Sequence, residues 1–310
     1  MRANTEWFKD AKWGLFITFL AAPASSSGGA DITSEEWNRQ VDSFDVMSLA
    51  GQLEELRVKY IFITLGQNTG HYCSPNETYD KIVGICPSKC SRRDLVNDLY
   101  EVLEPRGIKL LVYLPGNAPE HDHVAVEKLE WSTSGGRRAE SQYKWEAITR
   151  EWSMRWGNKV KGWWVDGCYY ADDMYRHEDA PNFKSFAAAM KAGNPDSIVA
   201  FNPGIMTPVI SMTEYEDYTA GEINRAFPVM DGYIPTLERW VDGAQYHILS
   251  FIGDGWGIGN PRFPDEFIIG FTKYTNRLQG VVSWDVPLEK GLISKPFFEQ
   301  LARLSSSLRE

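Results

Sequence analysis

The chain has 310 residues, of which 43% are hydrophobic and 13% aromatic, and it carries a formal net charge of −10. This length and composition allow a sizeable buried core, whereas the negative charge argues against nucleic acid or an anionic membrane as partner, because both require clustered Lys and Arg. Neither a membrane-spanning window nor an apolar signal region is present, so we expect a soluble protein, cytoplasmic or exported with its leader removed.

Short β-rich runs alternate with amphipathic stretches along the chain. The runs predicted as strands are 13–19, 58–65, 107–114, 160–167, 197–202, 217–224, 245–251 and 280–286. The stretches predicted as helices include 45–58, 92–106, 141–156, 181–193 and 264–279. Near the starts of three of them stand Asp45, Asp94 and Asp265, whose carboxylates can accept hydrogen bonds from unpaired amides.

Eight strands that alternate with helices predict an α/β fold, a (β/α)8 TIM-like barrel. We expect residues 1–310 to form a single barrel domain. The run 217–224 is the weakest of the predicted strands, so an open doubly wound sheet is the alternative architecture.

Two carboxylates stand at predicted strand ends, where (β/α)8 barrels place their catalytic groups. Asp166 ends the fourth strand in GWWVDG, and Glu222 ends the sixth. A pair of carboxyl groups at one pocket is the minimum set for glycoside hydrolysis, with one attacking and the other protonating the departing oxygen. Desolvation in an aromatic setting would keep Glu222 protonated to higher pH. The purely structural alternative is that Asp166 caps a loop and Glu222 forms an ion pair, for example with Arg225.

Aromatic residues are abundant, with 12 Trp, 14 Tyr and 15 Phe. Aromatic side chains beyond the needs of a core often line sugar-binding grooves, because the apolar faces of sugars stack on them. The glycine-rich segment GDGWGIG (253–259) follows a predicted strand and carries no phosphate-binding lysine. We interpret it as a loop on the sugar side of the pocket that carries Trp256.

Cysteine and histidine spacing does not predict a disulfide scaffold or a zinc site. The cysteines are Cys73, Cys86, Cys90 and Cys168. Their irregular spacing favours reduced thiols over a single disulfide in an exported protein. His121 and His123 form an HxH pair without further ligands at recognisable spacing, so a solvated helix start is favoured over the site of a metal hydrolase. The chain contains no GxSxG, Walker or GxGxxG sequence, and we expect no cofactor.

Six segments follow one another along nearly the whole chain: WFKDAKWGLFITF (7–19), SEEWNRQ (34–40), ITLGQNTGHYCSP (63–75), RRDLVNDLYEVLEPRGIKLLVYL (92–114), GWWVDG (162–167) and DYTAGEIN (217–224). In this order they resemble the α-L-fucosidase family, glycoside hydrolase family 29. The first and third segments are the most specific, whereas WxDG alone is a weak signal.

The resemblance implies a retaining exo-glycosidase that cleaves a terminal α-linked sugar from an oligosaccharide or glycoside. It also implies that residues 1–310 are a single catalytic barrel domain, with no appended β-sandwich of the kind that many relatives have. Asp166 would be the nucleophile, forming a glycosyl-aspartate, and Glu222 the acid/base. The substrate-binding residues implied by the aligned segments are Glu36, Trp37, Gln67, Asn68, Tyr113, Trp164 and Trp256.

Several hydroxyl-binding positions depart from the family pattern. Thr18 stands where the family has a substrate-binding His, Gln67 and Asn68 replace an adjacent His pair, and Asn202 falls near a sugar-binding Arg. Neutral side chains still bond hydroxyls, but a pocket built for one hydroxyl pattern discriminates against others, which favours an altered sugar preference. The alternative is a non-catalytic carbohydrate-binding barrel derived from the same scaffold.

Overall fold

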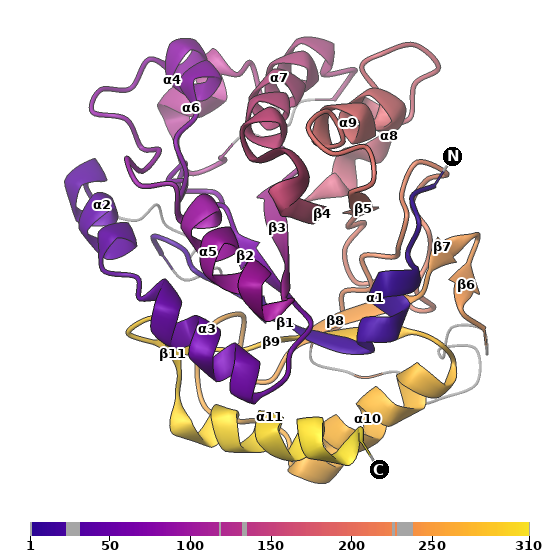
Figure 1. The fold of residues 1–310 in the computed structure, drawn as a ribbon. Helices are drawn as coiled ribbons and strands as arrows, with labels where there is room; N and C mark the ends of the chain where they lie inside the picture. Colours follow the sequence, from indigo (N-terminus) through magenta and orange to yellow (C-terminus); the bar gives the residue numbers. More distant parts are fainter. Residues whose placement is uncertain are drawn as a thin grey trace.

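The computed structural model describes residues 2–22, 32–117, 119–131, 135–224, 227 and 238–309 (Figure 1). The elements are α1 (Glu6–Ala11), β1 (Trp13–Ile17), α2 (Ser34–Asp42), α3 (Val46–Glu55), β2 (Tyr60–Thr64), α4 (Glu77–Val83), α5 (Leu95–Leu103), η1 (Glu104–Arg106), β3 (Lys109–Pro115), α6 (His123–Lys128), α7 (Ala139–Trp156), η2 (Gly157–Lys159), β4 (Val160–Asp166), η3 (Cys168–Tyr170), α8 (Ala171–Met174), α9 (Phe183–Met190), β5 (Ile198–Phe201), β6 (Trp240–Val241), β7 (Ala244–Gln245), β8 (His247–Phe251), α10 (Asp265–Arg277), β9 (Val281–Asp285), β10 (Leu288–Glu289), β11 (Leu292–Ile293) and α11 (Lys295–Ser307).

A seven-stranded parallel sheet forms the centre of the molecule, in the order β5-β4-β3-β2-β1-β9-β8. The larger helices lie outside it, as Figure 1 shows. Every residue of β1, β2, β8 and β9 is buried, as expected for parallel strands that are covered on both faces. The predicted α/β class is confirmed, and seven of the eight predicted strands form.

The predicted sixth strand, 217–224, does not form a regular strand, which corrects the expectation from sequence. Gly221 has a φ of +62°, a left-handed conformation that interrupts an extended ladder. The segment nevertheless lies along β7 and β8, through isolated parallel bridges from Tyr218 to Gln245 of β7 and from Glu222 to Leu249 of β8. At its other side the main-chain N–H of Asp217 donates to the carbonyl of Val199 in β5, at 2.7 Å.

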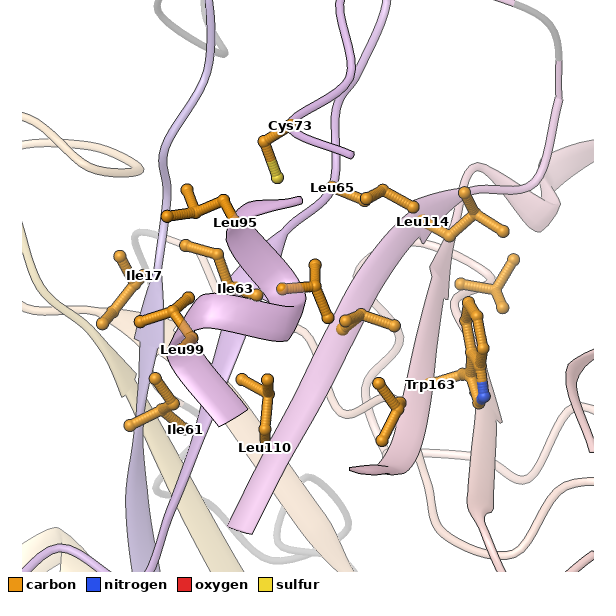
Figure 2. Packing of buried hydrophobic residues seen from close by; sticks show 14 of the residues in the cluster. Ile17, Ile61, Ile63, Leu65, Cys73, Leu95, Leu99, Leu110, Leu114 and Trp163 are labelled. Carbon is orange, nitrogen blue, oxygen red and sulfur yellow. The ribbon is translucent and has the colours of Figure 1, made fainter. Parts of the chain in front are cut away.

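Successive side chains of a strand point to opposite faces of the sheet, so the buried apolar residues form two main clusters, one on each face. Trp163 of β4 packs in the large outer cluster between sheet and helices, whereas Trp164 belongs to the cluster on the inner face. Figure 2 shows part of the outer cluster, in which α5 packs its apolar side chains onto β2 and β3. Each such aliphatic side chain contributes about 1.5–3 kcal/mol when it is fully buried. The labelled residues are Ile17, Ile61, Ile63, Leu65, Cys73, Leu95, Leu99, Leu110, Leu114 and Trp163.

The amino-terminal end of the inner face is filled by aromatic packing. Phe8 of α1 contacts the rings of Tyr60, Tyr218 and His247, with ring centroids 4.9, 5.1 and 5.3 Å apart. Beneath these rings three buried polar side chains are joined by hydrogen bonds, because Ser283 Oγ lies 2.8 Å from both Tyr60 Oη and His247 Nε2. Space for a ligand is therefore found at the opposite end, beyond the carboxyl ends of the strands.

Two of the three predicted helix caps are confirmed. Asp45 accepts from the N–H of Ser48, and Asp94 accepts from the N–H of Asn97. Asp265 is instead the first residue of α10, behind Pro264, and makes no capping bond. Its carboxylate contacts α11 through Gln300 and Arg303, which explains why a carboxylate near a helix start does not serve as the cap here. All four cysteines are free thiols, as expected.

Candidate active site

A pocket of about 200 Å³ opens where the strands end. Six of the residues predicted from sequence line it: Gln67, Tyr113, Trp164, Asp166, Glu222 and Trp256. The first four come from β2, β3 and β4 and lie near or just beyond the carboxyl ends of these strands, and Glu222 comes from the irregular segment beside β8. The topology thus brings together residues that are far apart in the sequence.

Asp166 is the last residue of β4 and accepts hydrogen bonds on both carboxylate oxygens. The hydroxyl of Tyr113 donates to Oδ2 at 2.6 Å, and the N–H of Gly167 donates to Oδ1 at 2.8 Å. Gly167 has a φ of +74°, so the chain turns sharply after the strand and its amide can meet the preceding side chain. The side-chain amide of Asn202 donates to Oδ1 at 2.9 Å.

Tyr113 connects Asp166 to Gln67. Gln67 Nε2 donates to Tyr113 Oη at 2.8 Å, and the ring of Tyr113 stacks on Trp164 with centroids 5.6 Å apart. Burial raises the pKa of Tyr113 well above its usual value, and the nearby charge of Asp166 adds to this effect. The hydroxyl therefore keeps its proton and acts as a donor to Asp166.

Glu222 lies in a more desolvating environment. Its pKa is raised to about 7, mainly by burial and also by the negative charge of Asp166, while a hydrogen bond from Asn202 lowers it. Asn202 Nδ2 donates to Glu222 Oε2 at 2.7 Å, in addition to its bond with Asp166. The two accepting oxygens can therefore be no further apart than the sum of these distances, about 5.6 Å.

The wall opposite these groups is built on Asp285, at the end of β9. Asp285 accepts from the hydroxyl of Thr18, which lines the pocket, and from the N–H of Gly257, each at 2.6 Å. This second bond anchors the loop that carries Trp256. Burial raises the pKa of Asp285 to about 7, against the two donors, which lower it.

Three residues implied by the family resemblance do not line the pocket. Glu36 makes the capping box of α2 with Thr33, and Trp37 is fully buried, donating from Nε1 to the carbonyl of Tyr72. Asn68 does not line the pocket either. Arg225, the proposed ion-pair partner of Glu222, lies outside the described residues.

Sequence reasoning missed two features of the site. In the sequence Asn202 stands at a predicted strand end and near a sugar-binding Arg of the family, and neither position predicts its contact with both carboxyl groups. Asp285 stands out in the sequence as the end of the last predicted strand, but the predicted site residues do not include it. Its contact with Gly257 depends on how a separate loop folds back.

The histidine pair belongs to a helix start. His123 is the first residue of α6, and Asp122 between the two histidines caps that helix through the N–H groups of Val124 and Ala125. Within the described ranges, no group of three or more His, Cys, Asp or Glu side chains could hold a metal ion. Among the helices in the described part of the chain, none is long and apolar enough to cross a membrane.

Comparison with known proteins gives structural relatives only. No family model matches the sequence, and no curated protein sequence does. The endo-fucoidan hydrolase MfFcnA4 of glycoside hydrolase family 107 is 16% identical with a TM-score of 0.73, covering 99% of this chain and 53% of its own. The endo-fucoidan hydrolase P5AFcnA, also of family 107, is 16% identical with a TM-score of 0.70, and the match covers 96% of this chain and 90% of P5AFcnA.

The α-L-fucosidase AlfC from Lactobacillus casei, in complex with α-L-fucose, is 15% identical with a TM-score of 0.67, covering 98% of both chains. The present chain spans about half the length of MfFcnA4 and nearly all of AlfC. The resemblance to α-L-fucosidases inferred from sequence motifs is confirmed at the level of the fold.

Proposed function

We propose that the chain is a retaining exo-glycoside hydrolase of the α-L-fucosidase type, with Asp166 as nucleophile and Glu222 as acid/base. The observation that carries this proposal is the pair of carboxyl groups that face one pocket and contact the same amide nitrogen. Retaining glycosidases hold their two carboxyl groups at about 5–5.5 Å, whereas inverting enzymes separate them by about 6.5–9.5 Å. The limit on the distance between the bridged oxygens supports double displacement.

The reaction proceeds in two steps. Asp166 attacks the anomeric carbon and the glycosidic bond breaks, while the proton of Glu222 passes to the departing oxygen. The Glu222 carboxylate then takes a proton from water, whose oxygen attacks the glycosyl-aspartate and releases Asp166 and the free sugar. The pKa of about 7 for Glu222 suits both roles, because a group that exchanges a proton works best near the operating pH.

Exo action on a terminal sugar is supported by the size of the pocket. Its volume of about 200 Å³ is below the range of roughly 300–1,000 Å³ typical of sites for drug-sized ligands. A single sugar ring fits such a space, stacking on Trp164 and Trp256, with its hydroxyls near Thr18 and Gln67. Structural relatives that act on fucose-containing substrates support an α-linked deoxy sugar or a close analogue.

We also propose that the scaffold is a (β/α)8 barrel in a single catalytic domain. The segment 217–224 contacts β8 on one side, and β5 on the other through Asp217, which are the contacts required of the missing sixth strand. An irregular backbone at this place brings Glu222 to the pocket.

The proposal is tested by Asp166→Asn, assayed against a panel of 4-nitrophenyl α-glycosides that includes the α-L-fucoside. We expect kcat/KM to fall by about 10³-fold or more, because the variant removes the nucleophile and keeps the side-chain shape. Asp172→Asn is the matched control, since the side chain of Asp172 is 85% exposed and bonds only Arg176 among the described residues.

Unchanged turnover by Asp166→Asn would rule out the assignment of the nucleophile. If the unmodified protein hydrolyses no glycoside of the panel but binds a monosaccharide in calorimetry, the non-catalytic sugar-binding barrel replaces the hydrolase proposal.

A further inference from the structure

We propose that Asn202 is a positioning residue that holds the carboxyl groups of the nucleophile and the acid/base at a fixed distance from each other and makes no contact with the sugar. This inference deepens the proposed function and rests on it. It departs from the expectation that Asn202 replaces a sugar-binding Arg, because the side chain is fully buried and does not line the pocket.

The hydrogen bonds of the Asn202 amide involve both of its N–H groups. Nδ2 carries two hydrogens and lies 2.9 Å from Asp166 Oδ1 and 2.7 Å from Glu222 Oε2. A planar NH₂ group directs its hydrogens along two fixed directions, so each hydrogen serves one carboxyl group. No donor of this side chain is left for a sugar hydroxyl.

The orientation of the amide is determined by its other end. Oδ1 accepts from the main-chain N–H of Gly204 at 3.1 Å, and a main-chain N–H can only donate. A flipped amide would place its NH₂ group against this donor and its oxygen against two carboxyl groups. The hydrogen-bond network therefore admits one orientation, in which both N–H groups point toward Asp166 and Glu222.

The backbone of Asn202 is fastened to the segment that carries the nucleophile. Its N–H donates to the carbonyl of Val165 at 2.7 Å, and its carbonyl accepts from the N–H of Cys168 at 3.0 Å. These bonds lie on either side of Asp166 in the sequence. Asn202 thus holds a fixed position relative to the nucleophile, from which its amide reaches across to Glu222.

The bridge, meaning the two hydrogen bonds from the Asn202 amide to Asp166 and Glu222, is compatible with both steps of double displacement. Before the first step Asp166 is charged and Glu222 carries the proton, whereas in the glycosyl-aspartate the ester is neutral and Glu222 is charged. One N–H of Asn202 meets the negative charge in each state, so the charge moves between the two groups without any side chain having to turn. Hydrogen bonds to charged groups contribute about 1.5–3 kcal/mol, so removing this donor should cost about 10- to 100-fold in rate.

The bridge also affects the protonation of Glu222. Among the described residues, the titratable groups facing Glu222 are Asp166 of β4 and Tyr169 of η3, and burial raises the pKa of Tyr169 so that it stays neutral. Asp166 raises the pKa of Glu222, whereas the hydrogen bond from Asn202 lowers it. Removing the amide must therefore shift the protonation of Glu222 to higher pH.

The test compares Asn202→Ala with the unmodified protein, measuring kcat and KM from pH 5 to 9 and product affinity by calorimetry. We expect kcat to fall about 10- to 100-fold, the alkaline limb of kcat/KM to move up by about one pH unit, and KM and product affinity to change less than about twofold. Asn202→Ser retains one hydroxyl donor and should give an intermediate result if its fold is intact by circular dichroism.

Asn117→Ala is the matched control. Asn117 is also buried and lies beside Gly167, but its amide donates to Glu120 and to neither carboxyl group of the pair. This variant should leave the alkaline limb in place. A loss of product affinity in Asn202→Ala with an unmoved alkaline limb would show that Asn202 binds the sugar, which overturns the inference.

A second readout does not depend on turnover. The pKa of Glu222 is measured by NMR in protein labelled with ¹³C at the glutamate carboxyl carbon, with Glu222→Gln identifying its signal. A higher pKa in Asn202→Ala supports the bridge even if no glycoside is hydrolysed, in which case only the proposed function fails. An unchanged pKa overturns the bridge whether or not the protein is a glycosidase.

Discussion

Asp166 and Glu222 carry the same chemical group in different surroundings. Asp166 receives donors on both oxygens, including Tyr113 and the N–H of Gly167, whereas the donor to Glu222 among the described residues is Asn202. This difference in hydrogen bonding and burial suits the two groups to the separate roles of the proposed double displacement.

The decline of kcat/KM at alkaline pH should follow the loss of the proton from Glu222. Since its pKa is about 7 and the first step needs the protonated form, kcat/KM should decline as the pH rises through about 7. Glu222→Gln should lack this limb and lose about 10²- to 10⁴-fold activity on glycosides with a sugar leaving group. The loss should be smaller for 4-nitrophenyl glycosides, whose leaving group needs little protonation. An alkaline limb that persists in Glu222→Gln would assign it to another group.

At this scale the sequence predicted the candidate carboxylates but not the residue that joins them. Asp166 could be found because an apolar strand, a carboxylate and a glycine follow one another. The role of Asn202 could not, because it depends on three segments whose ends meet only after folding. Glu36 and Trp37 were placed by resemblance alone, and the structure uses them in the cap and packing of α2.

At the scale of elements, the pocket wall depends on contacts between strand ends and one loop. Gly257 has a φ of +67°, and a Cβ atom there would lie 2.7 Å from Cβ of Thr18, so this position favours glycine on two grounds. Asp285 then holds Thr18 and Gly257 together. The presence of the loop could be predicted from its glycines, but its attachment to β9 could not.

Replacing Asp285 should therefore affect binding more than chemistry. Asp285→Asn places an NH₂ group, itself a donor, against either the hydroxyl of Thr18 or the N–H of Gly257, so one hydrogen bond is lost. We therefore expect the loop that carries Trp256 to loosen and KM to rise about tenfold, while kcat stays within about threefold. Asp254→Asn, an exposed residue of the same loop, is the control and should behave like the unmodified protein. Steady-state kinetics with the best aryl glycoside provide the measurement, and an unchanged KM for Asp285→Asn would contradict this role.

The strands themselves were well predicted because long apolar runs in a parallel sheet are buried on both faces. The exception, 217–224, has a strand-like composition that Gly221 interrupts. Its position beside β8 follows from the tertiary packing of the whole sheet, which local sequence does not encode.

At the scale of the whole molecule, burial has placed acidic groups where their charge is disfavoured. Glu216 is fully buried, and burial raises its pKa to about 8, although the N–H groups of Phe201 and Met212 donate to it. Asp285 and Glu222 are shifted in the same direction. The folded state therefore binds protons that the unfolded chain releases at lower pH, on a molecule whose net charge is already −10.

Stability should consequently fall as the pH rises. The contribution of Glu216 is fully present below its ordinary pKa of 4.5 and is lost as the pH passes through about 8. By calorimetry we expect one cooperative transition, as for a single domain, with a Tm lower at pH 8.5 than at pH 5.5 by about 3 °C or more. Glu216→Gln should reduce this dependence, whereas the exposed Glu140→Gln should not. Two separated transitions would contradict a single domain, and a Tm that rises with pH would contradict the role of the buried acids.

The two proposed catalytic carboxyl groups differ in how firmly the backbone holds them. Asp166 ends a strand paired on both sides, whereas the backbone of Glu222 is joined to β8 by an isolated bridge. Remodelling the segment around Glu222 would therefore disturb fewer ladder bonds than moving Asp166. In evolution or in directed redesign, this scaffold could therefore move the carboxyl group at position 222 while keeping the one at position 166 in place.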